Sequence, residues 1–397
     1  MTNSDPVVIV GAARTAMGGL QGDFASVPAS RLGATAIAAA LSRAGVSPDQ
    51  VDEVIMGCVL PAGLGQAPAR QAALGAGLPL AAGCTTVNKM CGSGMKSAML
   101  AHDLILAGSA KIMVAGGMES MSNAPYLLDR ARTGYRMGHG RVIDHMFYDG
   151  LEDAYEKGRL MGSYAEDCAE AYQFSREQQD DWAITSLTRA QKAIADGSFA
   201  AEIVPVSVKS GKTERVVASD EQPPKANMDK VRSLKPAFRD GGTVTAANSS
   251  SISDGGAALV LMRRSEAEHR GLSPLAVIRG HATFADKPSL FPTAPVGAIR
   301  KLLERTGWSR DQVELFEVNE AFAVVAMAAM RDLGLPAERV NIHGGACALG
   351  HPIGASGARI MVTLLYALQA RGLKKGVATL CIGGGEGTAV ALELCSY

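Results

Sequence analysis

The chain has 397 residues and equal numbers of acidic and basic side chains, so its formal net charge is zero. No overall field attracts it to nucleic acid or to a membrane surface, and any anionic ligand must be held by a local basic patch. The length exceeds one ordinary hydrophobic core and predicts two or three packed units. The 45 glycines and the 47% hydrophobic share, with only 5% aromatic residues, indicate small side chains packed closely between many turns.

The seven cysteines are scattered and odd in number, which predicts no disulfide framework and favours the reducing interior of a cell. A short polar stretch precedes the first apolar run, with no signal peptide, presequence or lipidation motif. The longest apolar run, around 321–330, is too short to span a bilayer and ends at Arg331. We therefore expect a soluble cytoplasmic protein.

Strand patterns and helix patterns alternate along the chain. Strands are expected, in chain order, at 7–10, 53–59, 111–115, 257–262, 276–279, 315–318 and 377–382. Helices are expected at 31–44, 94–106, 176–196, 296–305, 321–333 and 357–370. This alternation is typical of α/β layers.

A weak internal repeat divides the chain. In the first copy, Ser93-Gly94 is followed by a helix and by a strand that ends in glycines. In the second copy, Ser356-Gly357 is followed by a helix and by a strand that ends near Gly385. Either two Gly-rich segments are alike by chance, or two related halves build one site between their strand ends. Residues 122–249 are richer in charge and poorer in strands. We predict a first half at 1–121 that resumes at 250–272, an insertion at 122–249 and a second half at 273–397.

Cys91 lies in the run Asn-Lys-Met-Cys-Gly-Ser-Gly, residues 88–94, just before a helical pattern. The positive end of a helix lowers the pKa of a nearby thiol toward neutrality, and flanking glycines let another molecule approach closely. The alternative is a buried structural cysteine. The glycine-lined junction favours a nucleophile.

Two further glycine-rich runs carry partners for Cys91. Residues 344–357 hold His351 between a glycine and a proline, and residues 381–387 begin with Cys381. Each could be an ordinary loop or core residue, and two cysteines with a histidine also raise the question of a metal. Because the three form no paired C-x-x-C or H-x-x-x-H unit, no metal site is expected.

These runs, together with Asn-Glu-Ala-Phe-Ala at 319–323, resemble the thiolase family in the family's own order over nearly the whole chain. Within it the likeness is to the short acetyl-CoA acetyltransferases, or acetoacetyl-CoA thiolases. The resemblance implies an α/β fold of duplicated α/β/α halves, stacked as five layers (αβαβα), with an inserted loop domain that covers coenzyme A. It implies a homotetramer, a dimer of dimers, formed with help from the loop tip at 133–144.

The same resemblance implies the ligands and partners. Acetyl-CoA and acetoacetyl-CoA are the expected partners, with no nucleic acid and no membrane. Coenzyme A serves as substrate and product in lipid metabolism, and no further cofactor is expected. The sequence leaves open whether a monovalent cation is needed.

The resemblance also assigns the catalytic roles. Cys91 would be the nucleophile and His351 its activator. Cys381 would be the base at the alpha carbon, because a thiol with a pKa near neutral both takes up and releases a proton. The backbone N–H groups of Cys91 and Gly383 would hold one oxyanion, and His351 with a water bound by Asn319 the other. The residue types alone also allow a simple acyl transferase, and an Asn before a helix is usually an N-cap.

Coenzyme A carries phosphates, yet the chain has no phosphate-binding loop of the G-x-x-x-x-G-K-[ST] type. We therefore expect the insertion and nearby loops to bind coenzyme A. Residues that match the family's pantetheine tunnel, or would as easily be core, are Leu151, Met161, Ala246, Ser250, Ile252, Ala321 and Phe322. The basic residue that usually meets the nucleotide has no clear counterpart. We expect Lys225 or Lys230, or Arg232, in its place.

Four positions depart from the family pattern. Leu160 stands where a histidine is common, His343 replaces an asparagine, and Glu386 places a charge inside the last glycine loop. Phe291, followed by a proline, occupies the place of a methionine–glycine pair. It resembles the mitochondrial acetoacetyl-CoA thiolases, whose pocket accepts a 2-methyl branch; the alternative is a packing residue.

The leading hypothesis is an acetyl-CoA C-acetyltransferase. It would condense two acetyl-CoA into acetoacetyl-CoA and coenzyme A, and run the reverse thiolysis, through acetyl-Cys91. The first alternative is a degradative 3-ketoacyl-CoA thiolase for longer or 2-methyl-branched chains. A decarboxylating ketosynthase would lack Cys381, and an inactive acyl-CoA-binding scaffold would have lost part of the set.

Overall fold

The computed structural model describes residues 5–210 and 213–395. One long mixed sheet runs through it in the order β13-β14-β15-β12-β1-β11-β5-β3-β4. Its strands are β1 Val7–Thr15, β3 Glu53–Gly57, β4 Gly83–Val87, β5 Ile112–Ser120, β11 Ser253–Arg263, β12 Ala276–Ala285, β13 Leu315–Val318, β14 Lys375–Ile382 and β15 Glu386–Leu394. Two short strands, β2 (Gly18–Gly19) and β8 (Ile203–Val204), pair beside this path.

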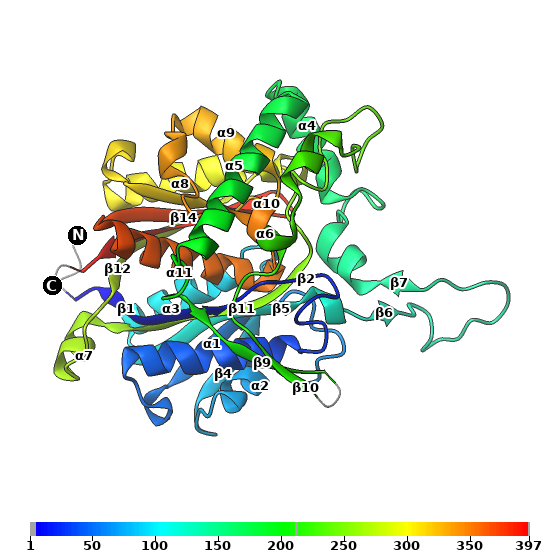
Figure 1. Cartoon of the computed structure of the whole chain (residues 1–397). Helices are drawn as coiled ribbons and strands as arrows, with labels where there is room; N and C mark the ends of the chain where they lie inside the picture. The colour runs from blue at the N-terminus through cyan, green and yellow to red at the C-terminus, as the bar shows by residue number, and fades with distance from the viewer. Residues whose placement is uncertain (1–4, 211–212, 396–397) are drawn as a thin grey trace.

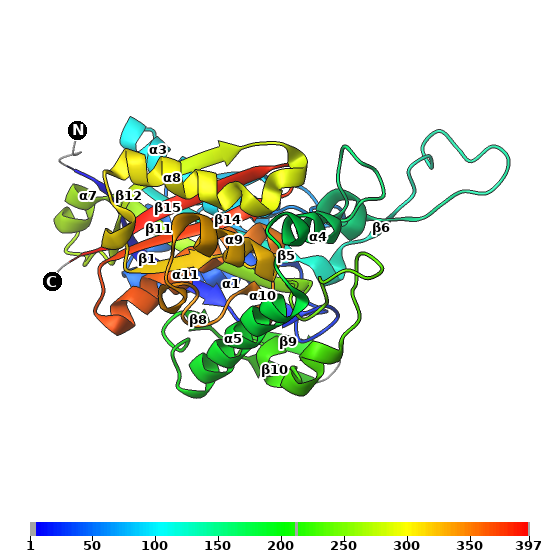
Figure 2. The same ribbon diagram turned by 90° about the horizontal axis from the view of Figure 1, so that it is seen from above.

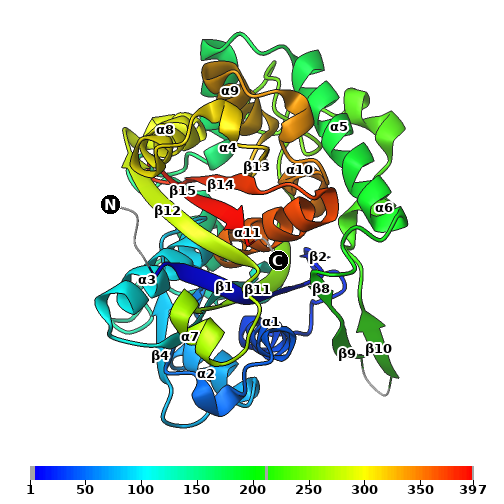
Figure 3. The ribbon, with the colours of Figure 1, turned by 90° about the vertical axis from the view of Figure 1, so that its left-hand side faces the viewer.

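The sheet folds over so that helices form three layers around its two arms (Figure 1, Figure 3). Helices α3 (Ser93–Ala107) and α11 (Ile353–Arg371) pack against each other between the arms. Helices α1 (Ala29–Ala44) and α2 (Pro68–Gly75) cover the outer face of the first arm, and α8 (Ala294–Thr306) and α9 (Ala323–Leu333) cover the second. The result is the expected five-layered αβαβα stack.

The two arms repeat one pattern. In the first, β3 is parallel to β5, and β5 is antiparallel to β11. In the second, β13 is parallel to β14, and β14 is antiparallel to β15. In each arm a central helix directly precedes the second strand of the parallel pair: α3 precedes β5, and α11 precedes β14. The duplication predicted from the sequence is confirmed, and a short β1–β12 pairing joins the arms.

Burial on both faces explains why the central strands read as continuous small and apolar runs. Every residue of β1 and β5 is buried. The two central helices approach at glycines: a Cβ on Gly94 would lie 2.8 Å from the backbone nitrogen of Ala358, and one on Gly357 would lie 2.3 Å from that of Met95. Among the described helices, α11 is long and apolar enough to cross a membrane, but 83% of that stretch is buried inside this protein.

Residues 121–252 leave the stack between β5 and β11. They contain α4 (Met161–Ala171), α5 (Arg176–Ala195), α6 (Gln222–Lys225), the β9–β10 hairpin (Val206–Ser210 and Thr213–Val217) and a second pair, β6 (Tyr126–Leu127) with β7 (Ile143–Asp144). Beyond β6 and β7 the chain forms a long arm that projects from the body (Figure 1, Figure 2).

The predicted strands and helices are all present, most with shifted ends, whereas β4, β15, α2 and α4 are among the elements that were not predicted. Strand β1 runs on to Thr15, beyond the predicted end at 10, because the small residues that follow remain buried. Strand β4 lies at the sheet edge and is only partly buried, so it lacks the apolar run that identified the other strands.

Candidate active site

A cavity of about 490 Å³ opens where the two arms meet the segment 121–252. Cys91, His351 and Gly383 line it, together with a largely apolar wall. An enclosed apolar space with a few convergent polar groups is the usual form of a small-molecule site.

Cys91 follows β4 and lies two residues ahead of α3. Met90, directly before it, has a φ of 46°, a left-handed backbone conformation that is uncommon for a residue with a long side chain. Gly92 caps the helix, and a Cβ there would lie 2.4 Å from Cδ1 of Ile382. The tight turn therefore presents Cys91 to the cavity while its loop contacts the end of β14.

The thiol of Cys91 differs from the sequence prediction. Burial raises its pKa above the ordinary value, and the charge of Glu119 acts in the same direction. The backbone N–H groups of Gly383 and of Cys91 itself act the other way, because they stabilise the thiolate. The expected shift toward neutrality is wrong, since desolvation outweighs the two stabilising N–H groups.

His351 lines the same cavity as Cys91. Its Nδ1 lies 2.5 Å from Oγ of Ser356, which donates its own hydrogen to the carbonyl oxygen of Pro352 at 2.9 Å. The hydroxyl therefore accepts the Nδ1–H, and Nε2 carries the lone pair. Burial, and next the charge of Arg359, lower the pKa of His351 to about 3, so the ring is neutral at neutral pH. Nε2 is buried and has no hydrogen-bond partner among the described residues.

Cys381 and Asn319 lie at the carboxyl ends of the parallel strands β14 and β13. Both are buried, and neither belongs to the cavity wall. Burial raises the pKa of Cys381 well above its ordinary value, and a charge on Cys91 raises it further. The expectation of a near-neutral Cys381 is therefore also wrong. Both polar atoms of the Asn319 side chain lack a partner within the described ranges.

Glu119 was not predicted from the sequence. It lies near the end of β5, fully buried, and accepts hydrogen bonds from the N–H groups of Val59 (2.9 Å), Leu60 (3.1 Å) and Gly354 (2.8 Å). Burial raises its pKa to about 7. Glu119 thus ties the loop after β3 to the start of α11, beside His351. A carboxylate in an otherwise apolar buried strand was the available signal.

Glu320 was likewise not predicted, although it belongs to the motif at 319–323. Its carboxylate accepts hydrogen bonds from Trp182 Nε1 (3.1 Å), Ser186 Oγ (2.8 Å), Asn341 Nδ2 (2.8 Å) and the N–H of Cys347 (3.1 Å). These contacts tie α5 to the loop that leads into His351.

All eight residues predicted for the acyl and pantetheine wall line the cavity: Leu151, Met161, Ala246, Ser250, Ile252, Phe291, Ala321 and Phe322. The two lysines differ. Lys230 lines a second cavity of about 280 Å³, which shares Ala246 with the first. Lys225 lies outside both and pairs with Glu221 on its own helix turn.

The other three residues that depart from the family pattern lie in different parts of the structure. Leu160 lines the cavity. His343 lies outside it, buried against the ring of Phe199, and burial lowers its pKa to about 4. Glu386 forms an ion pair with Lys89.

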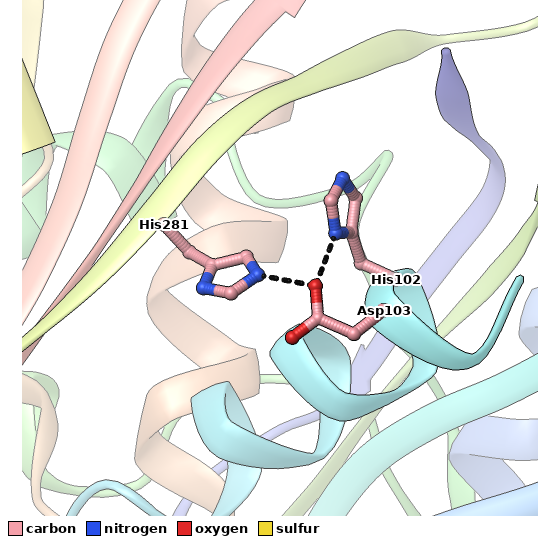
Figure 4. Close-up of side chains that lie close together, drawn as sticks. All are labelled: His102, Asp103 and His281. Atoms are coloured by element: carbon pink, nitrogen blue, oxygen red, sulfur yellow. Dashed lines mark hydrogen bonds and ion pairs between the residues drawn. The ribbon is translucent and has the colours of Figure 1, made fainter. Parts of the chain in front are cut away.

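A second cluster of ionisable side chains lies outside the cavity (Figure 4). Oδ1 of Asp103 is 2.9 Å from Nδ1 of His102 and 2.9 Å from Nε2 of His281. Among the described residues it is the one group of three or more His, Cys, Asp or Glu whose ligand atoms lie close enough for a metal ion. Two imidazoles and a carboxylate suit zinc, and here the carboxylate already joins both rings. The cluster connects α3 to β12.

One cavity thus holds a cysteine, a neutral histidine and two backbone N–H groups that face the sulfur, which are groups that acyl transfer through a thioester requires. The thiolase N-terminal domain model matches residues 7–265, and the thiolase C-terminal domain model matches residues 272–394. The chain belongs to the thiolase family.

Relatives agree over their full lengths. Acetyl-CoA acetyltransferase 2 of Arabidopsis thaliana is 52% identical over 395 residues, covering 99% of this chain and 98% of the relative. The acetyl-CoA acetyltransferase of Escherichia coli is 52% identical over 389 residues, covering 97% and 98%. The crystal structure of the Bacillus anthracis acetyl-CoA acetyltransferase has a TM-score of 0.96 at 42% identity, covering 98% of this chain and 99% of that one.

Proposed function

We propose that this thiolase is an acetyl-CoA C-acetyltransferase, which condenses two acetyl-CoA into acetoacetyl-CoA and coenzyme A and catalyses the reverse thiolysis. The names of its full-length relatives support the substrate, and the cavity supports the chemistry. The single observation that carries the mechanism is the unpartnered Nε2 of neutral His351 in the cavity that Cys91 lines.

In the first half-reaction His351 Nε2 takes the proton of the Cys91 thiol, and the sulfur attacks the thioester carbonyl. The N–H groups of Cys91 and Gly383 hold the oxyanion. As the tetrahedral intermediate collapses, the coenzyme A thiolate leaves and takes a proton from the Cys381 thiol. The products are acetyl-Cys91, free coenzyme A, protonated His351 and a Cys381 thiolate.

In the second half-reaction the Cys381 thiolate removes an alpha proton from the second acetyl-CoA. The enolate oxygen is held by His351 and by a water bound to Asn319. The carbanion attacks acetyl-Cys91, and the departing Cys91 sulfur recovers its proton from His351. The raised pKa of Cys381 suits both tasks, because burial keeps it a proton donor at rest and makes its thiolate a strong base once formed.

The remaining predictions belong to the same proposal. Residues 122–249 form the loop domain that covers coenzyme A, inserted into a first half at 1–121 and 250–272, and 273–397 form the second half. Lys230, beside the cavity, meets the nucleotide, with Lys225 as the alternative. No further cofactor is required.

The projecting arm supports assembly. Its exposed apolar side chains include Met137, 97% exposed, and Val142, 62% exposed, and water is an unfavourable surrounding for both. We assign the arm, with its tip at 133–144, to contacts within a homotetramer, a dimer of dimers, in the cytoplasm.

The experiment has two parts. Mass spectrometry after mixing with acetyl-CoA should find an acetyl group on Cys91, and a Cys91→Ala variant should carry none. A label on Cys381 or Cys84 instead would remove Cys91 as the nucleophile. Thiolysis of a ladder of 3-ketoacyl-CoA lengths should show the highest kcat/KM for acetoacetyl-CoA, whereas a maximum at a longer chain would favour a degradative 3-ketoacyl-CoA thiolase.

A further inference from the structure

An ion pair joins the two loops that bear the catalytic cysteines. Nζ of Lys89 contacts Oε2 of Glu386, and the two side chains are only 20% and 34% exposed. They are 297 residues apart in the sequence and come from different halves of the molecule. Lys89 stands two residues before Cys91, and Glu386 stands three residues after Gly383.

The backbone of Lys89 is fixed within the Cys91 loop. Its N–H donates to Oγ of Ser93 at 2.8 Å, and its carbonyl accepts the N–H of Gly92 at 3.0 Å. Lys89 and Cys91 are also paired by an isolated β-bridge. A displacement of Lys89 therefore displaces the N–H of Cys91.

On the other side, Glu386 opens β15 directly after the turn at 383–385. Gly384 and Gly385 have φ of 96° and 91°, so this turn depends on backbone conformations that glycine adopts readily. Within the turn the N–H of Gly385 donates to the carbonyl of Ile382 over a long 3.3 Å, and the carbonyl of Gly385 accepts the N–H of Asp286 at 2.8 Å. The ion pair at Glu386 therefore acts on the C-terminal end of a turn that carries Gly383.

The two oxyanion donors, the N–H groups of Cys91 and Gly383, thus belong to separate loops. Within the described ranges no backbone hydrogen bond joins residues 88–94 to residues 382–387. Other contacts therefore set their spacing, among them that of the N–H of Gly383 with the sulfur of Cys91. Two involve other side chains: the close approach of Gly92 to the side chain of Ile382, and the Lys89–Glu386 pair.

We propose that the Lys89–Glu386 ion pair is a clamp that holds the two oxyanion donors at the spacing required for acetyl transfer, so that both are positioning residues. This inference rests on the proposed function. A partly exposed ion pair adds little to the stability of a fold, but a small misplacement of reacting groups has a large effect on rate. The clamp should therefore act on the rate of acylation and hardly on folding or on substrate affinity.

The test is the rate constant for acetylation of Cys91 in a single turnover with acetyl-CoA, measured with steady-state kcat and KM. Lys89→Gln and Glu386→Gln should each lower the acetylation rate about three- to tenfold and leave KM within about twofold. The double variant should be no slower than the slower single variant, since both remove the same contact. The exchanged pair Lys89→Glu with Glu386→Lys should recover most of the lost rate.

A matched control exists on the same strand. Glu393 pairs with Arg279 at comparable exposure but lies at the end of β15 far from the turn at 383–385, so Glu393→Gln should acetylate like the wild type. Thermal unfolding shows which variants are folded, and Lys89→Arg, which keeps the charge, should stay within about twofold of the wild-type rate.

Single variants with wild-type acetylation rates, losses that add in the double variant, or an exchanged pair no faster than the single variants would each overturn the clamp. A wild-type enzyme that does not acetylate Cys91 would instead overturn the proposed function. The two failures are therefore distinguishable.

Discussion

Two clusters of ionisable side chains connect the halves of this chain, and their polar atoms are satisfied to different degrees. In the cluster of His102, Asp103 and His281, one carboxylate oxygen meets a nitrogen of each ring (Figure 4). His351 Nε2, in the cavity wall, and both side-chain polar atoms of the buried Asn319 have no partner in the described part of the chain.

The difference is informative because an unpartnered buried polar atom costs about 1–3 kcal/mol. By residue types alone, two histidines and an aspartate form a stronger chemical motif than a histidine between two distant cysteines. The site around Cys91 and His351 is nevertheless the one that retains unpartnered lone pairs and donors. The comparison predicts large effects of substitution in the cavity and small ones in the second cluster.

The largest expected effect concerns Cys381→Ser. The variant should still exchange acetyl groups through Cys91, because a coenzyme A thiolate can leave without being protonated. Its condensation rate should fall roughly 10²- to 10⁴-fold, because a serine hydroxyl is far harder to deprotonate than a thiol and so supplies almost no base at carbon. Radiolabelled acetyl exchange and acetoacetyl-CoA formation measure the two steps. Cys395→Ser, outside the cavity, is the control, and full condensation activity in Cys381→Ser would exclude this residue from the mechanism.

Ser356→Ala should have the next largest effect. Without the hydroxyl, Nδ1 of His351 loses its partner, and the ring no longer favours the tautomer with the lone pair on Nε2. We expect kcat to fall on the order of tenfold, the effect of one hydrogen bond of about 1.5 kcal/mol. Ser356→Thr, which keeps the hydroxyl, is the matched variant. Equal activity of the alanine variant and the wild type would leave the tautomer without a catalytic consequence.

Phe291→Met should change selectivity by a smaller factor. Phe291 lines the cavity and packs edge-on against Tyr164, so the phenyl ring serves both as wall and as core. We expect wild-type cleavage of 2-methylacetoacetyl-CoA within about tenfold of acetoacetyl-CoA in kcat/KM, and a selective loss for the branched substrate in the variant, because one methyl group alters binding by about 1–3 kcal/mol. Equal losses on both substrates would reduce Phe291 to a packing residue.

The smallest effect is expected for Asp103→Asn in the second cluster. The variant should keep kcat within about twofold, and its free energy of unfolding should fall by about 1 kcal/mol, as for the loss of one ordinary hydrogen-bonded carboxylate. Urea unfolding and steady-state kinetics are the measurements. A large loss of activity, matched by a loss for His281→Gln, would contradict the contrast between the two clusters.

Sequence reasoning succeeded where the signal is local. Strand 315–318 was predicted to the residue, and the glycine-rich runs led to Cys91, His351 and Gly383, which line one cavity. The residues that the family resemblance assigned to the pantetheine wall line the same cavity.

The rest depends on the tertiary structure. The pKa directions of both cysteines were wrong because the extent of burial is not encoded in neighbouring residues. Glu386 looked like an isolated anomaly, since its partner Lys89 is 297 residues away. The contact of Ser356 with His351 was missed because a serine within a glycine-rich run of the sequence gives no indication of what its hydroxyl will contact.

Helix α11 has a consequence for biosynthesis. It packs on β5 and β11 of the first half, yet it begins only at residue 353 and is therefore synthesised long after those strands. Until α11 has been synthesised, the inner face of the first half lacks one of the two helices that cover it in the folded protein. Contacts between segments so distant in the chain form slowly, and an uncovered apolar face invites association with other chains. The N-terminal half should therefore depend on chaperones until nearly the whole chain has been made.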